Sequence, residues 1–80
     1  MPGSALSEVE RLRLKRRALE EGLGEFLHEG RRVRDALERD GWRSYALERK
    51  ARELAENARR TERELAECDA ALAALERATD

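Results

Sequence analysis

The sequence predicts an all-α protein: an antiparallel two-helix coiled-coil hairpin that assembles into a four-helix bundle. Charged residues make up 44% of the 80-residue chain and aromatic residues only 4%, a composition typical of long helices or coiled coil. Apolar residues recur along both halves of the chain with the alternating spacing of a heptad repeat. Between the halves stands Asp40-Gly41, a pair suited to a helix end and a turn.

The first helix is expected over residues 5–39, after a flexible leader at residues 1–4. Ser4 or Ser7 can cap its start, and the segment from Ser7 to Glu10 has the form of a capping box. In heptad lettering, the apolar seam of this helix occupies positions a and d, which fall on Ala5, Val9, Leu12, Arg16, Leu19, Leu23, Phe26, Gly30, Val33, Leu37 and Asp40. A break at Gly22 and Gly24 is the alternative, but the register passes through both glycines unchanged, which favours one continuous helix.

The turn is expected at residues 40–43 and the second helix at residues 44–78, with a short tail at 79–80. Either Asp40 or Ser44 can cap this helix. Its seam positions fall on Ser44, Leu47, Ala51, Leu54, Ala58, Thr61, Leu65, Cys68, Leu72, Leu75 and Thr79. At this length, the two helices and their turn make one small domain.

Folding the chain about Trp42 brings the two seams into register. Every a position of one helix then meets a d position of the other, as an antiparallel pair requires. Leu37 meets Leu47, and Gly30 meets Leu54, so a large residue opposes a small one. This match favours a closed hairpin, although two chains that exchange helices through the same joint would form the same layers.

Charges beside the seam partly agree with this register. Arg34 is expected near Glu48, and Arg13 near Asp69. An exposed ion pair contributes under about 1 kcal/mol, so such pairs tune the register and do not decide it.

Arg16 is the charged residue that the heptad repeat places deep in the seam. Its aliphatic stem is expected to pack inward while its guanidinium reaches out to a carboxylate, namely Glu20, Glu64 or Asp69. The alternative is an anion site between the helices, which would suit an all-helical enzyme.

The sequence shows no pattern of residues that points to catalysis, a cofactor or a metal. His28 and Cys68 are the one histidine and the one cysteine, and they fall in different layers. His28 takes the outward position f, and Cys68 takes a d position expected to bury it as a small hydrophobe, with a reactive thiol as the alternative. We therefore expect no enzyme.

The net charge, the single cysteine and the lack of a long apolar run argue against several other classes of protein. Lys and Arg number 17 against 18 Asp and Glu, which argues against a basic protein that coats nucleic acid. A single cysteine leaves no internal disulfide, and no apolar run has the length of a membrane span or the layout of a signal peptide. The expected location is therefore the cytoplasm, without membrane binding.

A basic run is the feature that would support a nucleic-acid binder. The cations that could contact phosphates are Arg11, Arg13, Lys15 and Arg17. These positions spread around the whole helix, and acidic residues lie opposite them, so nucleic-acid binding is a rival reading and not the expected one.

Partner binding is the function that the pattern favours. One seam hardly offsets the conformational entropy of two long helices, so a second contact is expected. Apolar or aromatic residues outside the seam that could make it are Leu6, Leu14, Leu27, Trp42, Tyr45, Ala66, Ala70 and Ala73. The sequence thus predicts a non-enzymatic interaction or adaptor module that forms a homodimer of hairpins or docks on a partner protein.

A regulatory hairpin is the other rival reading. It would insert its tip into a larger complex through Glu38, Asp40, Trp42 and Tyr45. Trp and Tyr are favoured as interface anchors, but the same two aromatic residues could instead cover the end of the seam.

Overall fold

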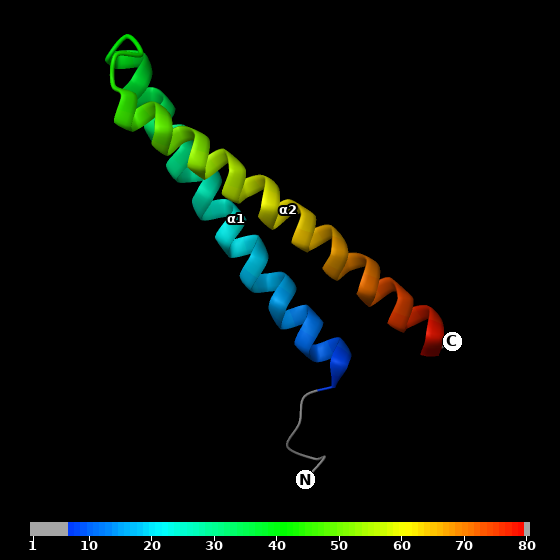
Figure 1. The fold of residues 1–80 in the computed structure, drawn as a ribbon. Coiled ribbons are helices and arrows are strands. Elements are labelled where there is room, and N and C mark those ends of the chain that lie inside the picture. The colour runs from blue at the N-terminus through cyan, green and yellow to red at the C-terminus, as the bar shows by residue number, and fades with distance from the viewer. Residues whose placement is uncertain (1–6, 80) are drawn as a thin grey trace.

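The computed structural model describes residues 7–79, which form two helices, α1 (Glu8–Arg39) and α2 (Tyr45–Thr79). The helices fold back on each other, so the turn lies at one end of a rod and both helix ends that lead to the termini lie at the other (Figure 1). The prediction of an all-helical hairpin is confirmed. The predicted leader at residues 1–4 and the last residue of the predicted tail lie outside the described residues.

α1 begins at Glu8, and Ser7 is its N-cap; residues 5 and 6, which were also predicted to be helical, lie outside the described residues. The backbone of Ser7 is extended, at φ −63° and ψ 159°, and its hydroxyl oxygen accepts a hydrogen bond from the Glu10 amide at 3.1 Å. The same hydroxyl donates to Oε1 of Glu10 at 3.1 Å. The bond from the Glu10 amide satisfies one of the backbone donors that the first helical turn leaves without a partner, and the bond between the side chains holds the Ser7 hydroxyl in place. From there α1 runs without a break past Gly22 and Gly24, as its unchanged register predicted.

α1 ends in a Schellman motif. The amide of Trp42 donates to the carbonyl oxygen of Leu37 at 2.9 Å, and the amide of Gly41 donates to that of Glu38 at 3.2 Å. Gly41 has φ +67°, the left-handed conformation that this motif requires. Asp40 therefore caps the end of α1 and does not cap α2.

α2 begins at Tyr45, one residue later than predicted, because Ser44 belongs to the turn as the N-cap. Its hydroxyl oxygen accepts from the Leu47 amide at 3.2 Å, and its carbonyl oxygen accepts from the Glu48 amide at 3.1 Å. The helix then continues to Thr79, one residue past its predicted end.

The seam lies where the heptad repeat places it, but it is only partly buried. From Val9 to Leu75, every seam position is buried or half-buried except Asp40, which is exposed in the turn. Among the described residues, those that are buried all belong to the seam: Val33, Leu37, Leu54, Ala58, Thr61, Cys68 and Leu72. The rod measures 56 × 25 × 14 Å, so it is one layer of helices thick, and no further element within residues 7–79 covers its faces.

The best-packed part of the seam lies next to the turn. Val33, Leu37 and Leu54 form its centre, and Leu37 is 0% exposed. Half-buried residues that pack against this centre are Phe26, Leu47 and Ala51. They belong to the layers expected when the chain folds about Trp42.

Farther from the turn, polar contacts join the helices. The Cys68 thiol, which is buried as predicted, donates to the carbonyl oxygen of Leu12 at 3.2 Å. The Arg16 guanidinium leaves the seam and pairs with both Glu20 and Asp69. Glu20 and Asp69 are two of the three carboxylates predicted for Arg16, and its long side chain reaches them from the seam, as expected. The pairing also expected between Arg13 and Asp69 is not formed within residues 7–79.

Candidate functional site

One face of the hairpin is hollowed between α1 and α2 close to the turn. We call this hollow the tip groove. Its apolar lining comes from both helices and consists of Phe26, Leu27, Gly30, Ala51, Leu54, Ala55 and Ala58. Charged residues that line it are Arg31, Arg34, Asp35 and Glu38. The space is open because α2 contributes alanines where a larger side chain would fill it.

Trp42 stands at the turn end of the same face. Together with Arg34 and Glu48 it lines a hollow that shares Ala51 and Ala55 with the tip groove. Trp42 is 54% exposed, and Leu27, on the edge farther from the turn, is 50% exposed. Two large apolar side chains therefore border a stretch of small ones.

The backbone of Trp42 has a conformation that its residue type rarely adopts. Its φ is +62°, directly after the left-handed Gly41. A left-handed conformation costs a residue with a Cβ roughly 1–2 kcal/mol, and glycine is the usual choice there. Strained residues of this kind cluster at functional positions. Here the strained residue places its ring beside the tip groove.

We expect Trp42→Gly to be more stable than Trp42→Ala by about 1 kcal/mol, contrary to the usual order of these residues. Both variants lose the indole ring, but only glycine is relieved of the left-handed strain. Urea unfolding followed by circular dichroism measures the difference. An alanine variant as stable as the glycine variant would mean that the turn changes its conformation.

Gly30 leaves room on the floor of the tip groove. A Cβ built at this position would lie 4.0 Å from the Cβ of Leu54, which is an ordinary van der Waals contact. Gly30 therefore lies opposite Leu54, as predicted, but an alanine at this position would also fit against α2. In a helix interior glycine costs about 1 kcal/mol relative to alanine, so within one hairpin this cost has no compensation.

The residues predicted to make a second contact do not share one face. Leu27 and Trp42 border the tip groove, and Tyr45 lies beside the turn, 70% exposed. By register, Ala66 and Ala73 continue along the groove side of α2, Ala66 exposed and Ala73 half-buried. Leu14 and Ala70 fall at the outward position f and are exposed, and Leu6 lies outside the described residues.

The basic run does not form a single surface. Arg11, Arg13, Lys15 and Arg17 are all exposed, but they fall at heptad positions c, e, g and b and so point in different directions around α1. The guanidinium of Arg16 is engaged by two carboxylates, which occupies the group that an anion site between the helices would use.

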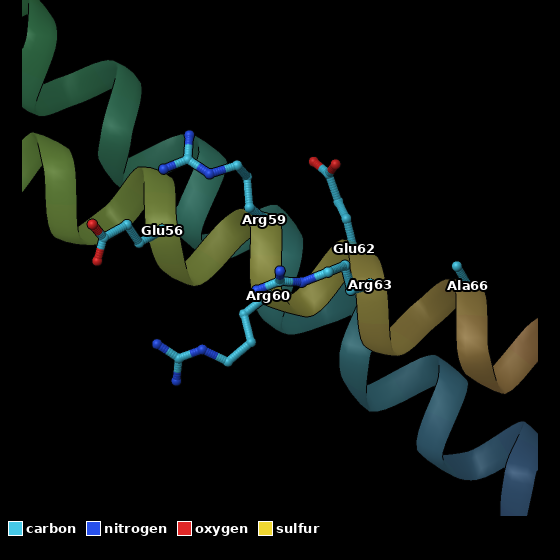
Figure 2. Close-up of a pocket in the computed structure, with 6 residues that line it drawn as sticks. All are labelled: Glu56, Arg59, Arg60, Glu62, Arg63 and Ala66. Carbon is cyan, nitrogen blue, oxygen red and sulfur yellow. The ribbon is translucent and has the colours of Figure 1, made fainter.

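A further hollow lies on the outer side of α2, away from the seam. Its lining consists of Glu56, Arg59, Arg60, Glu62, Arg63 and Ala66 (Figure 2). Figure 2 shows that Arg59 and Glu62 extend to one side of the helix and Arg60 to the other. These charged groups do not converge on a common point, so the hollow is the exposed charged face of one helix.

The remaining groups with reactive or metal-binding chemistry are separated from each other. Cys68 is buried in the seam, where its thiol is hydrogen-bonded, and His28 is exposed. Within residues 7–79 there is no cluster of three or more His, Cys, Asp or Glu side chains that could hold a metal ion. Neither described helix contains an apolar stretch long enough to cross a bilayer.

The tip groove is a feature that reasoning from the seam alone missed. The signal was present: Ala51, Ala55 and Ala58 repeat at helical spacing on the side of α2 that faces Gly30. No protein-family model matches the chain, and comparisons with curated proteins and with solved structures found no match.

Proposed function

We propose that this hairpin is a non-enzymatic interaction module that self-associates through helix packing. The simplest assembly is a homodimer in which two hairpins form a four-helix bundle. The observation that supports this proposal is the incomplete burial of the seam. On α1 only Val33 and Leu37 are buried, and large seam residues such as Leu12, Leu19 and Leu23 remain half-exposed.

The energetics of a single layer of helices favour a second layer. A core in a chain below ~70–80 residues rarely contributes more than ~3–5 kcal/mol, and this chain is at the edge of that range. Leu27, a large apolar residue outside the seam on one of the open faces, is 50% exposed. A second hairpin would cover one of the open faces and convert half-buried seam residues into a core.

We expect sedimentation equilibrium to give a mass of about twice the 9.2 kDa of one chain. The helical circular dichroism signal should weaken on dilution, since unfolding of a dimer depends on concentration. A mass of one chain at the highest soluble concentration would contradict self-association.

A regulator that docks through the turn is the second candidate, supported by the exposure of Tyr45 at 70%. Its ring lies on the first turn of α2, outside the seam and outside the residues that line the tip groove. In this case binding of a partner protein would depend on Tyr45, while the mass of the isolated chain would not.

A further inference from the structure

We propose that the tip groove is the surface on which two copies of this chain meet. In this dimer the two hairpins pack face to face about a two-fold axis parallel to the length of the rod, with both turns at the same end. The inference rests on the self-association proposed above and specifies its face and its direction. Four independent features of the described residues support it.

The face is self-complementary in shape. Leu27 projects from α1 at the edge of the groove, and Ala55 and Ala58 line the groove on α2. The proposed axis places α1 of one copy on α2 of the other. Leu27 of each copy then enters the space beside the alanines of its partner, and the contact occurs twice, as two-fold symmetry requires.

Gly30 gives the second argument. Inside one hairpin a Cβ at this position would meet only Leu54, at 4.0 Å, so packing against α2 does not exclude a side chain. The open side of Gly30 belongs to the tip groove. Small residues let the backbones of two helices approach closely, and a second hairpin on this face supplies the helix that uses the space.

The charges on the groove edge give the third argument and select the direction. Arg34, Glu48 and Arg52 line the same hollow, and none of the three forms an ion pair within residues 7–79. With both turns at the same end, Arg34 of each copy lies level with the segment between Glu48 and Arg52 of the other, where its side chain can turn to the carboxylate. With the turns at opposite ends, α1 would lie on α1, and Leu27 would face Arg34, an apolar side chain against a charge.

Trp42 gives the fourth argument. Its left-handed backbone, at φ +62°, directs an exposed indole onto the groove face. Tryptophan is enriched among the residues that dominate binding at protein interfaces. The face of the rod measures 56 × 25 Å, which is large enough for the ~800 Å² per partner of a standard interface.

The groove is tested by measuring the dimer dissociation constant of the original protein and of its Leu27→Glu and Leu14→Glu variants by sedimentation equilibrium. Leu27→Glu should weaken the dimer by roughly 30-fold or more, because it places a carboxylate in a desolvated contact. Leu14→Glu is the matched control, since Leu14 is also a leucine of α1 and is 53% exposed, but it points away from α2. The control should stay within about twofold of the original protein.

Ala55→Glu tests the other helix of the groove. It should weaken the dimer as Leu27→Glu does, because each alanine is proposed to receive the leucine of the partner. Circular dichroism must show both variants to be helical at the concentrations used. If Ala55→Glu unfolds the hairpin, the groove is tested by Leu27→Glu alone. Leu27 is half exposed and lies outside the seam, so its replacement should leave the hairpin folded.

The direction is tested by the distance between spin labels on the two turns. A cysteine is introduced as Arg43→Cys in a Cys68→Ala background, so that each chain has one label site in the exposed turn. Turns at the same end predict a label separation far below the 56 Å length of the rod. The opposite arrangement, with Leu27 facing Arg34, sets the two turns roughly 40 Å apart at 1.5 Å per helical residue, so a separation of that size or more overturns the proposed direction.

The outcomes separate this inference from the proposed function. A monomeric original protein overturns both. A dimer that Leu27→Glu leaves as tight as Leu14→Glu keeps self-association and overturns the groove as its surface. The full proposal is supported if Leu27→Glu weakens the dimer, Leu14→Glu does not, and the spin labels on the two turns lie close together.

Discussion

Replacing Leu37 with alanine is expected to leave most of the chain unfolded at 25 °C. Leu37 is 0% exposed and lies at the centre of the packed layers beside the turn. A buried Leu→Ala change costs about 2–5 kcal/mol, while a chain of this size has little more than ~3–5 kcal/mol in total. Far-ultraviolet circular dichroism in increasing urea measures the loss of helix.

Leu14→Ala provides the comparison, because it removes the same atoms from a side chain that is 53% exposed on the same helix. Its stability should stay within about 0.5 kcal/mol of the original protein when both are measured at one concentration. Equal unfolding midpoints for the two variants would contradict the packing of the seam at the turn.

Replacing both Gly22 and Gly24 with alanine is expected to stabilise the hairpin by roughly 2 kcal/mol and to raise its Tm by roughly 10 °C. Both glycines lie inside α1, and a Cβ built at either one has no neighbour within 4 Å. Alanine therefore gains helix propensity without a steric cost. Thermal unfolding by circular dichroism is the measurement.

Gly41→Ala is the control for this change, since the same substitution should have the opposite sign. Gly41 has φ +67°, where a Cβ is strained, so this variant should lose stability. If the Gly22 and Gly24 variant is also destabilised, the helix does not run continuously through these positions.

Most of the architecture follows from local patterns in the sequence. The heptad repeat runs through Gly22 and Gly24 without a change of register, and α1 is continuous there. Ser7 and Ser44 are typical capping residues in front of helical segments, and both act as N-caps. Cys68 is buried as predicted, and Thr61 is buried although threonine is not a typical core residue, because the repeat places both in the seam.

Other features could not be predicted because they depend on distances between the helices. By register both Arg13 and Arg16 were expected near Asp69, and only the distances in the folded hairpin show that Arg16 forms the ion pair. The conformation of Trp42 gave no signal either, since a tryptophan is a poor candidate for positive φ. The predicted interaction residues were grouped by their apolar character, and only their positions around the helices show that Leu14 and Leu27 face different directions.

The sequence by itself determined the two helices, their turn and the pairing of their seams, because periodicity and capping depend on neighbours within a few residues. The tertiary structure decided which residues of the two helices come together in the tip groove. That groove depends on both helices at once: Leu27 and Gly30 come from α1, the alanines from α2, and the strained backbone of Trp42 closes the end. Such a surface exists only after the chain folds back, since its two sides are distant in sequence.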